Sequence, residues 1–234
     1  MGTAQTVDGR PSSDLTARAR IRDAAIECFA RDGFEASFRS IATRVDVSPG
    51  LITHHFGSKA TLRAECDAEV LRQYRLVKAD AITRPSAHLL EALAAPGLSG
   101  TLLVYILRAI HAGGQPAREF LDHLMADVRG VMADAVASGL VRPSRDEEAR
   151  LRHLTYQTMG ALLVEFVTSP GLTPDEFVAA LHAGTRESVL PTLELFSEGL
   201  LTSTDMLDDY LTYRGRHPAD EAPPGETERA ARPT

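Results

Sequence analysis

The sequence predicts an all-α protein: a small N-terminal head of three helices containing a helix-turn-helix, and a larger helical domain behind it. Apolar residues recur at steps of three and four along most of the chain, which is the spacing of amphipathic helices. Glycine, proline and serine breaks separate these segments at lengths typical of globular helices. The alternation of β-branched residues that marks strands is missing from the sequence. Together these observations predict helices packed on helices.

The composition indicates an ordinary globular protein. Of its 234 residues, 44% are hydrophobic and 24% are charged, and the longest apolar runs fall far short of the ~20 residues that cross a bilayer. The polar N-terminus lacks a signal-peptide pattern. We therefore expect a cytoplasmic protein with no membrane partner. Cys28 and Cys66 lie among apolar neighbours, which favours two buried thiols over a redox-sensing pair. The scattered histidines predict neither a metal site nor a cofactor.

The net charge of −7 is distributed unevenly along the chain. Residues 1–84 carry 13 Lys and Arg against 11 Asp and Glu, whereas residues 85–234 carry 12 against 21. The acidity therefore belongs to the second part of the chain. A local basic surface on the first part is enough for phosphate binding, so the net charge does not exclude a nucleic-acid partner.

The first part of the chain predicts four helices with recognisable caps. Ser37 and Ser48 stand where N-caps belong, and Pro49 follows at the first helical position. Gly33 suits a left-handed cap at the end of the first helix, and Ser58 is the N-cap of a long fourth helix. We expect a flexible arm at residues 1–13 and helices at 14–32, 38–45, 49–56 and 59–81.

The rest of the chain predicts further helices separated by proline and glycine. Ser144 and Glu147 form a capping-box pattern, and after about Gly215 the sequence loses apolar periodicity and predicts a disordered tail. We expect helices near residues 87–94, 99–111, 116–137, 145–168, 174–183 and 185–198. The domain boundaries predicted from these segments are 14–74 for the head, 75–214 for the larger domain and 215–234 for the tail.

Residues 37–56 have the length of a helix-turn-helix. Ile52 and Phe56, four residues apart, are expected to seat the second helix of the motif on the head, and Val47 is expected to fill the turn. Gly50 lets the backbone approach DNA closely, and the helix N-terminus favours phosphate. On or near the outer surface we expect Pro49, Gly50, Leu51, Thr53, His54 and His55.

These residues stand in a longer pattern of fixed spacing. It runs Phe29-x-x-x-Gly33-Phe34-x-x-Ser37-x-x-x-Ile41-Ala42, then Val47-Ser48-Pro49-Gly50 and His55-Phe56-Gly57-Ser58-Lys59. The pattern resembles the TetR family of bacterial repressors over about residues 14–74. The resemblance implies a head that binds double-stranded DNA, and C-terminal helices that form a homodimer and enclose a ligand pocket.

The resemblance also implies roles for single residues. Ser37 and Arg39 would contact backbone phosphate, and Lys59 would clamp another phosphate. Two departures matter: Thr53 stands where the family usually has Tyr, which weakens one backbone contact, and Asp46 stands where it usually has Gly. Asp tolerates a left-handed conformation, so the turn is expected to survive. Leu51, Thr53, His54 and His55 would face the major groove or its rim, and the predicted DNA-binding residues also include Ser48, Pro49 and Gly50.

Each of these roles has a structural alternative. Leu51 could contact a thymine methyl or simply pack against the head, and the two histidines and Lys59 could be merely solvated. The arginines at 18, 20 and 22 either bind DNA or form a solvated face. Because the third helix carries no guanine-reading arginine, DNA shape and phosphate contacts are expected to dominate recognition.

The larger domain is expected to dimerise because two of its predicted helices are apolar nearly all round. Pairing the 145–168 and 185–198 helices with their symmetry mates would bury both. A two-fold axis then predicts a palindromic operator, with half-sites one helical turn or a multiple of it apart. Polar and aromatic side chains within apolar helices are candidates for binding a mostly hydrophobic effector. They are Tyr105, Arg108, His111, His123, Met125, Tyr156, Gln157 and Glu165.

The sequence therefore predicts a ligand-responsive repressor that an effector releases from its operator. An enzyme is not expected, because paired acids, metal ligands, a phosphate loop and a nucleophile elbow are all missing from the sequence. The remaining alternative is a helical protein-interaction module that has lost DNA binding. Thr53 and the net acidity leave that alternative open.

Overall fold

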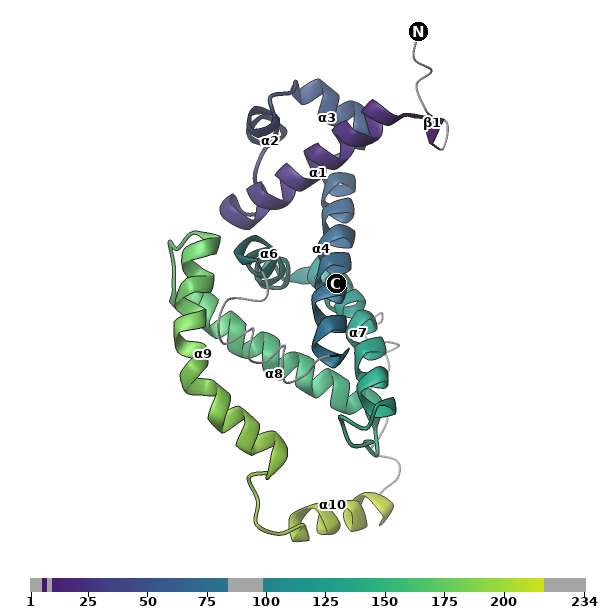
Figure 1. The fold of residues 1–234 in the computed structure, drawn as a ribbon, viewed down its shortest axis with the longest axis vertical. Coiled ribbons are helices and arrows are strands. Elements are labelled where there is room, and N and C mark those ends of the chain that lie inside the picture. The colour runs from purple at the N-terminus through teal and green to yellow at the C-terminus, as the bar shows by residue number, and fades with distance from the viewer. Residues whose placement is uncertain (1–5, 8–9, 84–98, 217–234) are drawn as a thin grey trace, which may run out of the picture. The chain divides into compact units, whose positions relative to one another are not determined.

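The computed structural model describes residues 6–7, 10–83 and 99–216 (Figure 1). The chain forms two compact units, Met1–Arg186 and Glu187–Thr234, and each is described by itself. Within the described residues all secondary structure is helical except one pair of two-residue strands. The all-α prediction is confirmed.

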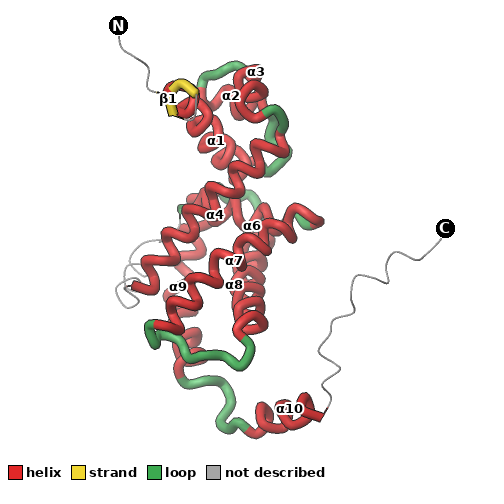
Figure 2. Tube along the Cα trace, turned by 90° about the vertical axis from the view of Figure 1, so that its right-hand side faces the viewer, coloured by secondary structure: helices red, strands yellow, loops and turns green. Residues whose placement is uncertain are grey.

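The head consists of α1 (Ser12–Asp32), α2 (Phe38–Val45) and α3 (Pro49–Phe56). The bounds of α2 and α3 are those that the sequence predicts. Strands β1 (Thr6–Val7) and β2 (Arg10–Pro11) pair antiparallel just before α1, within the segment expected to be a flexible arm (Figure 2).

Local hydrogen bonds explain why the head helices begin and end where they do. The hydroxyl of Ser37 accepts from the Ser40 amide at 3.1 Å, and the hydroxyl of Ser48 accepts from the Leu51 amide at 3.2 Å. Each bond satisfies an amide that a helix N-terminus leaves without a partner. Asp46 adopts the left-handed conformation at φ 53° and ends α2, as its place in the turn predicts.

The body of the first unit is built on α4 (Lys59–Thr83), which runs out of the head. It packs against α1 and α7 (Gly114–Ala137), while α6 (Gly100–His111) packs against α1, α7 and α8 (Glu147–Thr168). One buried apolar cluster runs through both parts, from Phe29 and Ile52 in the head to Tyr105 and Phe120 in the body. The head and the larger domain therefore share a core within this unit.

Two predictions about helix ends differ clearly from the structure. The α8 N-cap is Asp146, whose carboxylate accepts from the Ala149 amide at 2.8 Å. Only half of the expected capping box forms at Ser144. Its amide donates to the Glu147 carboxylate, but its hydroxyl accepts from the Asp146 amide and not from the Glu147 amide. The predicted 174–183 and 185–198 helices are one helix, α9 (Pro174–Ser197). Gly184 keeps its amide and a helical φ, so the chain continues through it.

The last described helix, α10 (Asp205–Arg216), ends slightly beyond the point where the sequence predicts the start of a disordered tail. The predicted 87–94 helix lies outside the described residues. None of the helices that the structure describes is long and apolar enough to cross a membrane.

Candidate nucleic-acid interface

Helix α3 presents a narrow exposed surface because two of its side chains hold it to the head. Ile52 is fully buried and Phe56 is 4% exposed, as the four-residue spacing predicts. Leu51 is half-buried and packs against the head core, which favours its packing role over a purely external one. The residues of α3 that are exposed are Pro49, Gly50, Thr53 and His54.

His55 differs from its neighbour because its surroundings are partly internal. It is half-buried, its ring lies 6.2 Å from the Phe56 ring, and its carbonyl oxygen accepts a hydrogen bond from Arg18. His54 is exposed. Of the histidine pair, His54 is therefore the better placed to meet a ligand outside the head.

Two cations flank α3 on the neighbouring elements. Arg39 is exposed in the first turn of α2. Lys59 begins α4, and its ammonium lies 3.8 Å from the carboxylate of Glu35, which is itself fully exposed. An exposed ion pair at that distance contributes little to stability, so the Lys59 ammonium can exchange Glu35 for another anion. The hydroxyls of Ser37 and Ser48 are already engaged as helix caps.

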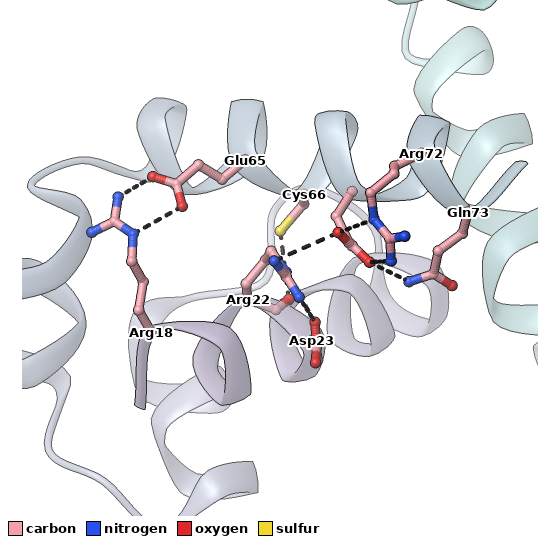
Figure 3. A network of polar contacts seen from close by, with 8 residues as sticks. Arg18, Arg22, Asp23, Glu65, Cys66, Arg72 and Gln73 are labelled. Carbon is pink, nitrogen blue, oxygen red and sulfur yellow. Dashed lines mark hydrogen bonds and ion pairs between the residues drawn. The ribbon is translucent and has the colours of Figure 1, made fainter. Parts of the chain in front are cut away.

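Two arginines of α1, Arg18 and Arg22, form ion pairs with side chains of the same unit (Figure 3). Arg18 binds Glu65 of α4, with its Nε 3.1 Å from a carboxylate oxygen, and its guanidinium carbon lies 4.6 Å from the centre of the Phe56 ring. Arg22 pairs with Asp23 at 2.7 Å and lies 3.6 Å from Glu69 of α4. Arg18 and Arg22 therefore join α1 to α4, and sequence reasoning did not foresee this role.

Glu69 is the centre of the polar contacts between α1 and α4. Its carboxylate also accepts hydrogen bonds from Arg72 at 2.7 Å and Gln73 at 2.8 Å (Figure 3). The hydrogen bond from Arg72 is the main cause that lowers the pKa of Glu69 to about 2. The carboxylate is therefore strongly held in its charged form at the junction of the two helices.

Both cysteines are free and buried, as the sequence predicts. Burial raises the pKa of the Cys28 thiol, and it raises the pKa of the Cys66 thiol further. Neutral thiols without access to solvent are poor nucleophiles and poor metal ligands. Among the residues described, no group of three or more His, Cys, Asp and Glu side chains is placed to hold a metal ion.

The eight residues predicted to bind an effector are not brought together. Tyr105 is fully buried, and its hydroxyl donates to Asp67 of α4 at 2.6 Å. Arg108 donates to the carbonyl oxygens of Ala30 and Arg31 at 2.7 and 3.0 Å, so it ties α6 to the end of α1. Met125 is half-buried, and the exposed residues are His111, His123, Tyr156, Gln157 and Glu165.

A cavity of the first unit lies between α4 and α7 and has a volume of about 750 Å³. Of the eight predicted residues, only His123 lines it. The side chains that line it come from the end of α1, the loop after it, one face of α4 from Lys59 to Arg75, and α7. They include Phe29, Phe34, Lys59, Arg63, Asp67 and Phe120. A smaller cavity of about 310 Å³ lies between α7 and α8.

Comparison with known proteins supplies the family. Residues 21–66 match the model of bacterial regulatory proteins of the tetR family, and residues 99–202 match the tetracyclin repressor-like C-terminal domain. The HTH-type transcriptional regulatory protein RaaS of Mycobacterium tuberculosis is 37% identical over 202 residues, which are 86% of this chain and 94% of RaaS.

Two solved structures align with most of this chain. A TetR-family transcriptional regulator from Rhodococcus sp. superposes with a TM-score of 0.51 at 16% identity, over 75% of this chain and 98% of that one. Salmonella enterica GusR gives a TM-score of 0.48 at 24% identity, over 72% and 93% of the two chains.

The order of the matched segments follows the order of the two structural parts. The helix-turn-helix lies within the first match, and α6, α7, α8 and α9 lie within the second. The similarity to RaaS runs across both. The family is one of transcriptional regulators and not of enzymes. This chain belongs to the TetR family of bacterial transcriptional regulators.

Proposed function

We propose that this protein represses transcription by binding a palindromic operator as a homodimer, and that a small, mostly hydrophobic molecule releases it. The observation that carries the proposal is the exposed face of α3, flanked by Arg39 and Lys59 and seated on a buried core. A DNA-binding regulator of this kind acts in the cytoplasm, where its operator lies.

Each part of this face has a role in binding DNA. Thr53 and His54 reach base edges in the major groove, while Arg39 and Lys59 bind phosphates on either side. Gly50 is exposed near the start of α3 and lets the helix N-terminus approach a phosphate. Because Thr53 is shorter than the tyrosine usual in the family, it contributes less to backbone contacts and leaves more of the affinity to the two cations.

Exposed apolar side chains support the homodimer. On α8 these are Tyr156, Val164 and Val167, each more than half exposed. In the second unit, Leu190 and Phe196 of α9 are exposed to more than 60%. A monomer rarely leaves such side chains in water, whereas a second copy related by a two-fold axis would bury them.

Release requires that the effector site and the head be coupled, and α4 supplies the connection. Its first residue flanks α3, and its face from Lys59 to Arg75 lines the 750 Å³ cavity. Tyr105 of α6 bonds to Asp67 of α4, and Arg108 of α6 bonds to the end of α1. A ligand that favours one arrangement of these helices by ~1–3 kcal/mol changes operator affinity by about 5–150-fold.

The DNA-binding half is tested by a gel-shift titration on DNA from the region upstream of the protein's own gene, at several salt concentrations. Lys59→Ala is expected to weaken binding to all sequences and to reduce the slope of log affinity against log salt by about 1. The control Arg142→Ala removes an exposed cation in the loop after α7 and should leave affinity and slope unchanged. An unchanged slope for Lys59→Ala would rule out its phosphate contact, and the absence of any shift would favour an interaction module.

A further inference from the structure

The cavity between α4 and α7 combines an apolar interior with charged ends. Phe29, Leu71 and Phe120 are each less than 7% exposed and line its depth. Ala60, Ala64 and Ala68 follow one another along the α4 face and leave room beside the helix. A volume of about 750 Å³ lies within the ~300–1,000 Å³ range of small-molecule sites.

Arg63 is a cation in this cavity with weak partners. Its guanidinium carbon lies 3.7 Å from the centre of the Phe34 ring, so stacking holds it in place. One carboxylate oxygen of Asp67 is 3.8 Å from Nε, and the other oxygen accepts a hydrogen bond from the Tyr105 hydroxyl at 2.6 Å. Nε and Nη2 are buried and donate no hydrogen bond within the described structure. The charge is therefore undercompensated.

Lys59 lies one helical turn before Arg63 on the same face of α4, so both line the same end of the cavity. Its partner Glu35 is fully exposed and 3.8 Å away, which leaves that pair weak.

The opposite end of the cavity is paired more tightly. Arg75 lies 3.3 Å from Asp127, whose side chain is only 16% exposed. Glu119 stands two helical turns before Asp127 on α7, so it lies nearer the head, and its carboxylate accepts a hydrogen bond from Gln115 at 3.0 Å. The cations that lack a closely bonded carboxylate are thus Arg63 and Lys59, at the end nearest the head.

We propose that this cavity binds an amphipathic organic anion, with its carboxylate or sulfonate between Arg63 and Lys59 and its apolar body along Ala64, Leu71 and Phe120. The inference deepens the proposed function, on which its regulatory consequence rests. The bound anion and the operator phosphate compete for the same ammonium of Lys59. Ligand and DNA therefore compete for one atom. Each weakens the binding of the other by the same factor.

Two dyes of the same aromatic scaffold test the site. 1-Anilinonaphthalene-8-sulfonate carries the anion, and N-phenyl-1-naphthylamine lacks it; both are followed by fluorescence on binding to the full chain. Arg63→Met keeps an unbranched side chain over Phe34 and removes the charge. We expect it to weaken binding of the sulfonate about tenfold, a loss of about 1.4 kcal/mol, and to leave binding of the neutral dye unchanged. Arg142→Met is the matched control and should change neither.

A second variant tests the cavity by a change that is expected to leave the fold intact. Ala64 is exposed on the cavity side of α4, so Ala64→Phe fills the cavity without removing a buried group, and circular dichroism checks that it stays helical. We expect it to lose both dyes. If Ala64→Phe binds both dyes as the wild type does, or if Arg63→Met weakens both dyes equally or neither, the proposed site is wrong.

A competition experiment separates this inference from the proposed function. The sulfonate dye should raise the dissociation constant for DNA in the wild type, and the shift should be at least fivefold smaller in Lys59→Ala. If the protein binds DNA but binding of the sulfonate dye does not depend on Arg63, the proposed anion site is wrong and the proposed repressor function is unaffected. If Arg63→Met weakens binding of the sulfonate dye as expected but the protein binds no DNA, the proposed repressor function is wrong and the anion site is unaffected. An equal shift in both proteins would overturn the competition at Lys59.

Discussion

At the scale of single residues, the exposed face of α3 is smaller than its sequence suggests. Thr53 and His54 are open, while Leu51 is half-buried and the His55 carbonyl is held by Arg18. The sequence predicts which residues of α3 are buried because Ile52 and Phe56 obey helical spacing. It does not separate the two histidines, because the difference arises from an arginine on another helix.

His54 is expected to set part of the base preference. His54→Ala should reduce affinity for the preferred site about tenfold, because it removes a base-edge contact of roughly 1–3 kcal/mol. Affinity for sites already altered at the contacted base should change little. Titrations against a set of singly substituted sites measure this, with His153→Ala on the exposed surface of α8 as control. A uniform loss across all sites would show that His54 binds phosphate or only supports the helix.

Arg18 is expected to stabilise the head without touching DNA. Its side chain is 24% exposed and joins Glu65, the His55 carbonyl and the Phe56 ring. Arg18→Met should lower the free energy of unfolding by about 2 kcal/mol, since hydrogen bonds to charged groups are worth roughly 1.5–3 kcal/mol. Arg142→Met, at an exposed position in the loop after α7, should change it by less than about 0.5 kcal/mol. Urea unfolding compares the two, and equal stabilities would contradict this role.

At the scale of elements, the helix ends that the sequence predicts correctly are those with local signals. Ser37, Ser48 and Asp46 set the ends of α2 and α3 by bonds within four residues. The division at Gly184 was wrong because a glycine with its amide can continue a helix that packing favours. The effector residues stay a prediction, and of the eight only His123 lines the cavity between α4 and α7. Arg108 bonds to carbonyls 77 and 78 residues away, and no pattern in the chain signals such a partner.

The stability of the polar cluster on α4, and to a lesser extent its contact with Arg22 of α1, should depend on pH through Glu69. Its pKa is about 2 in the folded protein against an ordinary value of 4.5, so folding favours the charged form. This stabilisation is complete above about pH 4.5 and is lost as the pH falls toward 2. Chemical unfolding should therefore show Glu69→Gln less stable than the wild type at neutral pH, with the difference shrinking in acid. A difference that stays constant down to pH 2 would show that hydrogen bonding, and not charge, holds the contact.

At the scale of the whole molecule, the first unit has one core that runs from the head into the body, and the cavity of about 750 Å³ lies beside it. Periodicity predicts that the helices of this unit are amphipathic. It could not predict that the faces of α4 and α7 leave a space between them, because that depends on how far apart two helices pack. Only the structure therefore reveals the cavity.

The protein is expected to be a dimer in solution. Light scattering at micromolar concentration should give about twice the chain mass of 25.3 kDa. Val164 is 61% exposed on α8, so Val164→Asp should cost the monomer little and place a charge in the dimer interface. That variant is expected to dissociate at concentrations where the wild type does not, whereas Arg142→Asp should remain dimeric. A wild type of 25.3 kDa at every concentration would contradict the dimer.

Selection of bound duplexes from a random DNA pool, at near-physiological salt, tests the central claim most directly. A repressor whose two heads are related by a two-fold axis should enrich a palindrome, with half-sites about one helical turn or a multiple of it apart. Repeating the selection with His54→Ala should keep the spacing and relax one position in each half-site. Enrichment of no sequence at all, or of a single site without symmetry, would contradict the account of this chain as a dimeric DNA-reading repressor.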